Sequence, residues 1–276
     1  MIPRTYLFVP GNRPERFAKA LASGADAVVL DLEDAVAPPD KDAARGAVGQ
    51  FLAAASAEQH ARLVLRINDE ATQWFEADLL LLVQTPGCSL MLPKAEQPAT
   101  LVRVRAACPG APVLALVESA RGVLNAEALA ECEGVSRLVF GTIDYALDLD
   151  LDLSADPAVG DIGLDHAAAR LALASRAAGL PAPVAGVTPD IDDETRLLAD
   201  FARARAHGFG AKLCIHPKQV APIHAALVPT ATELDWARRV VAAAKGSQGA
   251  VQVDGRMVDK PVLQRALRLL ARAAPR

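Results

Sequence analysis

The feature that most limits the fold of this chain is a regular alternation of short apolar segments with longer helical ones. Eight segments have the composition of buried strands: Thr5–Val9, Ala27–Leu32, Leu63–Ile67, Ser89–Leu92, Val113–Val117, Arg137–Phe140, Pro183–Val187 and Lys212–Ile215. Stretches of helical character lie between them, among them Pro14–Ser23, Asp40–Ala55, Ala99–Ala107, Ala126–Ala130, Asp165–Ala178 and Asp192–His207. Continuous apolar runs of this kind are typical of a parallel sheet covered by helices.

Eight strand segments alternating with helices predict an α/β protein built as a (β/α)8 TIM barrel. A doubly wound open sheet is the competing arrangement. Polar residues follow strand after strand, for example Arg66, Glu118, Asp144 and His216. A barrel gathers all of its carboxyl strand ends around one mouth, whereas an open sheet spreads them along a crevice. The repeated polar strand ends therefore favour the barrel.

Composition excludes several other classes of protein. Of 276 residues, 52% are hydrophobic and 22% charged, with a net charge of −4, so the chain can bury a large core and is not disordered. A nucleic-acid-binding protein usually carries a basic excess, which is missing here. No stretch approaches ~18 apolar residues, so no transmembrane helix is expected. The N-terminus does not resemble a secretory signal and the four cysteines form no C-x-x-C pair, so we expect a reduced, cytoplasmic setting.

The pattern changes after the eighth strand segment. A helix, a hairpin and a final helix are predicted there: Thr232–Lys245, the strands Val251–Val253 and Arg256–Val258 around Asp254-Gly255, and a helix opened by Pro261. We therefore expect a catalytic barrel domain over residues 1–230 and a C-terminal helical extension over residues 231–276. This extension is longer than a barrel needs, and it would serve as a lid over the mouth or reach a neighbouring subunit.

Two carboxylates suggest a metal site. Glu118 and Asp144 follow the predicted fifth and sixth strands, which are neighbours in a barrel. Two carboxylates without a nearby His or Cys suit a hard divalent ion such as Mg²⁺, which keeps water and substrate oxygens as further ligands. The alternative is a pair of unrelated surface acids, one of which caps a helix.

Arg66, at the end of the third strand, is the candidate anion-binding group at the mouth. Its guanidinium can hold a carboxylate or an oxyanion, or it can form a structural salt bridge with Glu33 or Asp34. Both can hold together, because a neighbouring acid orients the arginine. Strand alternation would send Asp31 and Glu33 to one side and Asp34 to the other, so not all three are expected to line the mouth.

Other charged residues have two interpretations each. Lys41 and Arg45 share a helix face and contact either a phosphate or only solvent, and the same alternatives apply to Arg13 and Arg16. Asp259 lies two residues before Pro261, where it would cap the last helix; as an active-site residue it needs the extension to close over a mouth.

A set of motifs, in order along nearly the whole chain, resembles one known family. They are Leu7–Arg16, Gly24–Val36, Lys41–Arg45, Arg66–Asn68, Leu92–Lys94, Glu118–Asn125, Gly208–Lys212, Ile215–Pro217 and Asp254–Asp259. The chain resembles the citrate lyase β-subunit-like group of the HpcH/HpaI aldolase superfamily, which includes malyl-CoA and citramalyl-CoA lyases. The resemblance implies a (β/α)8 barrel, a homotrimer or dimer of trimers, and Mg²⁺.

The resemblance also implies residue roles. Glu118 and Asp144 would be the metal ligands. Arg66 would hold the α-keto acid, and Asp259, on the lid of a neighbouring subunit, would be the acid/base. The arginines and lysine that would meet CoA phosphates are Arg13, Arg16, Lys41 and Arg45. One departure stands out: many members carry Glu immediately before the second metal ligand, and this chain has Ile143.

These observations together predict a Mg²⁺-dependent carbon–carbon lyase. Its substrate would be a 3-hydroxy-3-carboxyacyl-CoA thioester such as malyl-, citramalyl- or citryl-CoA, and its products acetyl-CoA and an α-keto acid such as oxaloacetate. One alternative is a citrate lyase β subunit acting on citryl-acyl carrier protein within a complex. Others are a metal-dependent aldolase of free hydroxy-keto acids and a non-catalytic barrel that binds CoA esters.

Overall fold

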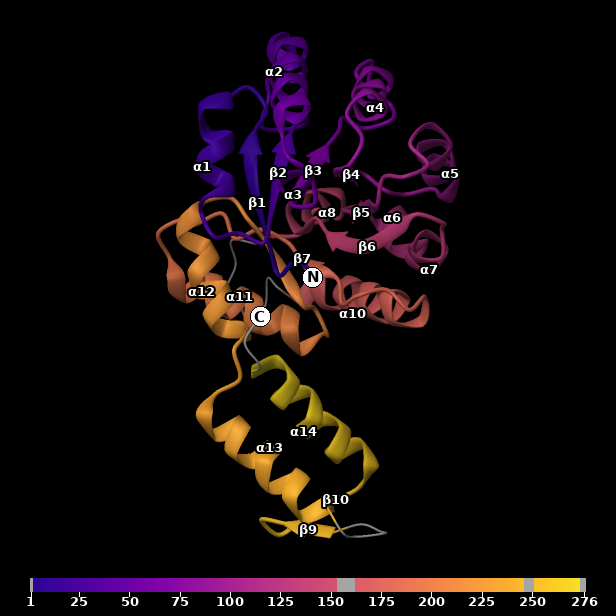
Figure 1. Cartoon of the computed structure of the whole chain (residues 1–276). Coiled ribbons are helices and arrows are strands. Elements are labelled where there is room, and N and C mark those ends of the chain that lie inside the picture. The colour runs from indigo at the N-terminus through magenta and orange to yellow at the C-terminus, as the bar shows by residue number, and fades with distance from the viewer. Residues whose placement is uncertain (1, 153–161, 246–250, 274–276) are drawn as a thin grey trace. The chain divides into compact units, whose positions relative to one another are not determined.

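The chain's first part folds as a closed barrel of eight parallel strands, which confirms the predicted fold class (Figure 1). The computed structural model describes residues 2–152, 162–245 and 251–273. The strands, each paired in parallel with the next and β8 with β1, are β1 (Thr5–Pro10), β2 (Ala27–Asp31), β3 (Leu63–Arg66), β4 (Ser89–Leu92), β5 (Val113–Val117), β6 (Val135–Phe140), β7 (Val184–Ala185) and β8 (Ala211–Cys214). β7 is the shortest, because pairing begins only after Pro183, which cannot donate a ladder hydrogen bond.

Helices follow the strands and cover the outside of the barrel (Figure 1). They are α1 (Phe17–Leu21), α2 (Lys41–Ala54), α3 (Ala57–His60), α4 (Phe75–Gln84), α5 (Pro98–Ala107), α6 (Ala120–Leu124), α7 (Ala126–Ala130), α8 (Thr142–Asp148), α10 (Ile162–Ala177), α11 (Glu194–Ala206) and α12 (Val220–Leu227), with short 3-10 turns at Pro14–Arg16, Pro38–Asp40 and Pro217–Gln219. None of the described helices has the length and apolar character needed to cross a bilayer.

Alternate strand residues fill the barrel interior. Val29, Val64, Met91, Leu116 and Val139 belong to one buried cluster inside the ring. Since side chains alternate along a strand, the residues between them face the helices. The interior is therefore a packed core, and polar chemistry is left to the ends of the strands.

Residues His224–Arg276 form a second compact unit with its own small core. It contains α13 (Ala231–Ala244), the antiparallel hairpin of β9 (Val251–Val253) and β10 (Arg256–Val258), and α14 (Lys260–Ala273). The hairpin turns through Asp254 and Gly255, both with positive φ, as a two-residue type I′ turn requires. The contacts divide the chain after Ile223, inside α12, whereas the sequence suggested a boundary at residue 230.

Candidate active site at the barrel mouth

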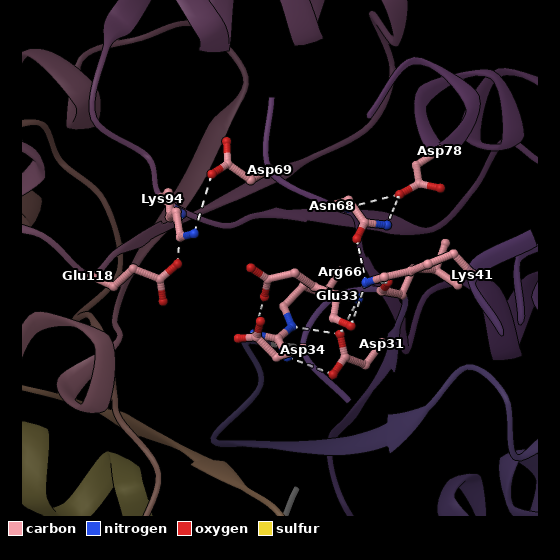
Figure 2. A network of polar contacts seen from close by, with 11 residues as sticks. Asp31, Glu33, Asp34, Lys41, Arg66, Asn68, Asp69, Asp78, Lys94 and Glu118 are labelled. Atoms are coloured by element: carbon pink, nitrogen blue, oxygen red, sulfur yellow. Dashed lines mark hydrogen bonds and ion pairs between the residues drawn. The ribbon is translucent and has the colours of Figure 1, made fainter. Parts of the chain in front are cut away.

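The register of the sheet places Asp31 directly beside Arg66 at the carboxyl ends of β2 and β3. Nε and Nη2 of Arg66 donate to the two carboxylate oxygens of Asp31 at 2.7 and 2.6 Å, a bidentate pair (Figure 2). The guanidinium also stacks 4.9 Å from the ring of Phe8. Burial favours the neutral form of Arg66, but the charge of Asp31 outweighs the effect of burial and raises the pKa of Arg66. Arg66 is therefore a fixed cation at the mouth.

Two further acids approach the same guanidinium. Nη1 of Arg66 lies 2.6 Å from Oε2 of Glu33 and 3.8 Å from Oδ2 of Asp34. The expectation that Asp31, Glu33 and Asp34 could not all line the mouth is wrong. The reason is that β2 ends at Asp31, so strand alternation no longer directs the two residues that follow. Burial raises the pKa of Glu33 to about 7, against the lowering effect of Arg66.

Lys41 lies at the start of α2 and is buried beside this ion-pair cluster (Figure 2). Its ammonium donates to the carbonyl oxygens of Leu32 and Glu33 at 2.7 and 2.8 Å, and to Oδ1 of Asn68 at 2.6 Å. An ammonium has three hydrogens, so all of them are used within the protein. Lys41 thus connects the segment after β2 to the segment after β3, and in this arrangement has no hydrogen left for a phosphate.

Arg45 and Asp78 extend the network behind Asn68. Asp78 of α4 is completely buried and accepts from the backbone and the side-chain amide of Asn68, at 2.9 and 2.6 Å. It also accepts from Nε of Arg45 at 2.6 Å, while Nη1 of Arg45 pairs with the exposed Asp42. Arg45 is therefore engaged with the scaffold that positions Asn68.

Arg13 and Arg16 are placed differently from Lys41. Both follow β1 and are exposed to solvent. Nη1 of Arg13 lies 4.0 Å, and Nε of Arg16 3.7 Å, from Oε1 of Glu15, which are long distances for ion pairs. Long exposed side chains of this kind are free to reorient. The phosphate prediction is therefore compatible with the placement of Arg13 and Arg16.

Glu118 follows β5 and is buried, with 5% of its surface exposed. The backbone N–H of Lys94 donates to its Oε1 at 2.7 Å (Figure 2). Lys94 has a φ of 45°, a left-handed conformation that is strained for a residue with a side chain. Its ammonium lies 3.5 Å from Asp69. Burial alone would lower the pKa of Lys94, but Asp69 and Glu33 raise it, so Lys94 is a poor candidate for a Schiff-base amine.

Glu118 and Asp144 share one electrostatic environment. Burial raises the pKa of Glu118 to about 8, and the charges of Glu33 and Asp144 add to the effect. Asp144 lies in the first turn of α8, which begins beside the end of β5 because Gly141 donates its N–H to the Val117 carbonyl. A Cβ at Gly141 would meet the carboxylate of Glu118, so only glycine leaves room here.

This donor set suits Mg²⁺. Burial and acidic neighbours disfavour the charge of the Glu118 carboxylate more than Arg66 favours it, and a divalent cation would offset this. No cluster of three or more His, Cys, Asp or Glu residues forms an ion site within the described ranges. Mg²⁺ commonly binds through one or two carboxylates and takes its remaining ligands from water and substrate.

Two further residues that the sequence singled out are Asp259 and Ile143. Asp259 belongs to the second compact unit, where its Oδ1 accepts from the backbone N–H of Val262 at 3.2 Å and caps α14. Ile143 is exposed on α8. Sequence reasoning quoted Asn68 only within the Arg66–Asn68 motif and missed Asp78; these two residues connect Lys41 and Arg45. Their signal was weak, since a polar residue on a helix and one in a loop are usually exposed.

The sequence matches two family descriptions. Residues 4–217 match HpcH/HpaI aldolase/citrate lyase, and residues 174–275 match C-C_Bond_Lyase of the TIM-Barrel fold. A citrate lyase subunit beta-like protein of Mycobacterium tuberculosis is 39% identical over 272 residues, which is 97% of this chain and 94% of that protein. A (3S)-malyl-CoA thioesterase of Cereibacter sphaeroides is 34% identical over 274 residues, covering 98% and 94%.

Solved structures agree with these matches. A crystal structure of the protein CitE from Mycobacterium tuberculosis, in complex with magnesium, acetoacetate and coenzyme A, is 38% identical. The two structures superpose with a TM-score of 0.87 over 98% of each chain. The order of the strands, the polar residues at their ends and these matches agree along the length of the chain. The chain therefore belongs to the HpcH/HpaI aldolase/citrate lyase family.

Proposed function

We propose that this protein is a Mg²⁺-dependent lyase that cleaves a 3-hydroxy-3-carboxyacyl-CoA thioester, of the malyl-, citramalyl- or citryl-CoA type, into acetyl-CoA and an α-keto acid. The observation that carries the proposal is the buried Glu118, with Asp144 and the fixed cation Arg66 near enough to act on its charge. The related CitE structure in complex with magnesium, acetoacetate and coenzyme A supports the same ligand classes.

Glu118 and Asp144 would hold the metal ion. When bound, Mg²⁺ would supply Lewis-acid stabilisation of negative charge on the substrate oxygens. Arg66 adds a guanidinium whose Nη1 and Nη2 each carry a second hydrogen beyond the bonds to Asp31 and Glu33. These hydrogens suit the carboxylate of the keto-acid fragment, and the three acids hold the guanidinium still while charge develops.

The acetyl-thioester fragment needs a proton after the bond breaks. We assign this proton to Asp259, contributed by a neighbouring copy of the chain in a homotrimer or dimer of trimers. Asp259 is half-buried and precedes α14, where its carboxylate accepts a backbone hydrogen bond. Arg13 and Arg16 would meet the phosphates of CoA, because both are exposed beside β1 and only weakly paired.

Two related activities are tested by the same assay. One relative is named a (3S)-malyl-CoA thioesterase, so hydrolysis of the thioester is the second candidate reaction. Another relative, the citrate lyase subunit beta of Escherichia coli, is 32% identical over 293 residues, which makes an acyl carrier protein the alternative acyl carrier. The products separate the first two reactions, because a lyase yields acetyl-CoA and a keto acid, and a thioesterase yields free CoA and a hydroxy acid. Cleavage of a free CoA ester would count against a requirement for an acyl carrier protein.

The decisive experiment incubates the protein and Mg²⁺ with malyl-, citramalyl- and citryl-CoA and identifies the products by mass spectrometry. We expect acetyl-CoA and the matching keto acid from at least one ester. Glu118→Gln keeps the size of the side chain but removes its charge, and should abolish both cleavage and Mg²⁺ binding measured by calorimetry. Full cleavage by this variant in the presence of EDTA would refute the proposal. The exposed Glu58→Gln is the matched control.

A further inference from the structure

A cavity lies outside the barrel wall, on the side of β6, β7 and β8 that faces the helices. It has a volume of about 530 Å³ and is bordered by residues of α10 and α11. Apolar walls are provided by Phe140, Ala168, Ala185 and Phe209. The residues assigned above to metal and keto acid are absent from its lining. A cavity of this size is large enough for a small organic ligand.

Lys212 of β8 lines this cavity. Its neighbours Ala211 and Leu213 belong to the core inside the barrel, so Lys212 points to the outer side of the strand. The side chain is almost completely buried, with 2% of its surface exposed. Its ammonium donates one hydrogen bond, to the carbonyl oxygen of Gly186 at 2.7 Å. Within the described part of the chain it forms no ion pair, and its other two hydrogens have no recorded acceptor.

Two acids of the lining, Asp165 and Asp200, are paired with cations other than Lys212. Nε and Nη2 of Arg203 donate to the two carboxylate oxygens of Asp165 at 2.9 and 2.8 Å, and His207 contacts the same carboxylate at 2.8 Å. Arg196 pairs with Asp200 at 2.6 Å. Asp165 and Asp200 are thus engaged with other cations, and the recorded hydrogen bond of Lys212 goes to a single peptide carbonyl.

The two further acids of the lining, Asp190 and Asp193, have no recorded ion pair with Lys212 within the described residues. Asp193 accepts from the backbone N–H of Arg196 at 2.8 Å and caps α11. Asp190 is exposed to solvent. A buried ammonium with one neutral acceptor is unfavourable unless a further partner completes its hydrogen bonds.

We propose that this cavity binds a small monocarboxylate with an apolar body, whose carboxylate pairs with Lys212. A carboxylate oxygen accepts the hydrogens that the ammonium leaves unused, and charge-assisted hydrogen bonds of this kind are strong. The hydrocarbon part would pack against Ala168, Ala185 and Phe209. A phosphate fits less well, because it would place a second negative charge near Asp165 and Asp200 without a second unpaired cation.

The test uses butanoate as the probe, with butanamide as its neutral counterpart. Butanoate has no 2-oxo or hydroxyl oxygen with which to chelate a metal, so it should bind poorly at the proposed metal site at the barrel mouth. Calorimetry and NMR chemical-shift changes on the full chain should show saturable binding of butanoate, and binding of butanamide weaker by at least about tenfold. Glu118→Gln should bind butanoate as the wild type does.

Two variants check the placement independently. Lys212→Met replaces the cation with an apolar side chain of similar length and should weaken butanoate at least about tenfold. Ala168→Leu keeps Lys212 but fills part of the cavity, and should also weaken binding, so the test remains valid if the first variant fails to fold. If the wild-type protein binds butanamide as tightly as butanoate, or does not bind butanoate at all, the proposal is overturned. Unchanged binding in both variants overturns it too.

Discussion

The ammonium of Lys41 and the side-chain oxygen of Asn68 are joined by a hydrogen bond of 2.6 Å. This bond connects two segments that are remote in sequence, one following β2 and one following β3 (Figure 2). Asp31 ends β2 and Glu33 lies in the first segment, while Arg66 ends β3 just before the second. The position of the mouth cation therefore depends on a lysine that does not contact it.

Replacement of Lys41 should therefore affect the keto-acid end of the substrate and not the CoA phosphates. We expect Lys41→Met to lower kcat/KM about 10- to 100-fold, the usual effect of removing a group that orients an active-site residue. The loss should be equal for CoA esters and dephospho-CoA esters. A contact with the ribose 3′-phosphate, which dephospho-CoA lacks, would instead give a loss that shrinks with the dephospho-CoA ester, and this pattern would count against the positioning role. Lys218→Met, at an exposed ion pair, is the control.

The two acids that pair with Arg45 should differ strongly in their effect on stability. Asp78 is completely buried and Asp42 is exposed. Asp78→Ala leaves the buried Nε of Arg45 and the amide of Asn68 without their acceptor, and should lower the free energy of unfolding by about 3–5 kcal/mol. Asp42→Ala should change it by about 0.5 kcal/mol or less. Urea denaturation of the two variants measures the difference, and similar losses would show that Asp78 is not the anchor.

Gly141 should be required for the shape of the metal site. A methyl group there meets the carboxylate of Glu118, so Gly141→Ala should displace Glu118 and weaken Mg²⁺ binding. The matched control is Gly110→Ala, because a Cβ at Gly110 meets nothing within 4 Å. Calorimetric titration with Mg²⁺ should show at least about a tenfold loss for the first variant and none for the second. Equal affinities would mean that Glu118 can shift without consequence.

Lys212 should make stability depend on pH. Burial lowers its pKa from 10.5 to about 8, although the charges of Asp200 and Cys214 oppose the shift. Between those two values the unfolded chain binds a proton that the folded chain does not, so this residue makes stability rise with pH. The unfavourable contribution is complete below pH 8. Lys212→Met removes it, so the variant should gain most over wild type at pH 7 and progressively less toward pH 10.

Chemical denaturation of both proteins at pH 7, 8, 9 and 10 measures this difference. Lys218→Met serves again as the control, since that lysine is exposed. An advantage of Lys212→Met that is constant with pH would show that the ammonium keeps its ordinary pKa in the folded protein.

The barrel was predictable because each of its strands is locally apolar and each is separated from the next by a helical stretch. The positions of Glu118, Asp144 and Arg66 at the carboxyl ends of strands were predictable for a related reason, because each directly follows or ends an apolar segment. The sequence also predicted that an acid would orient Arg66. It did not reveal that Asp31 is the bidentate partner, because that depends on the register between β2 and β3.

The parts that escaped prediction depend on contacts between distant segments. Lys41 and Arg45 share a helix face with the spacing of a solvated surface, and only the packing of α2 against the loops makes them internal. The strained backbone of Lys94 has no local signature, and its N–H donates to the carboxylate of Glu118, 24 residues away. In both cases residues with ordinary local preferences adopt a role that tertiary structure assigns.

Both reactive strand ends are secured by the loop of the strand before them. Arg66, at the end of β3, is secured from β2 through Asp31 and Glu33, and Glu118, after β5, is secured from β4 through the N–H of Lys94. Exchanging one loop with a homologue to alter substrate choice would therefore disturb the group on the next strand. Chimaeras of this barrel should work only when loops are transplanted as adjacent pairs.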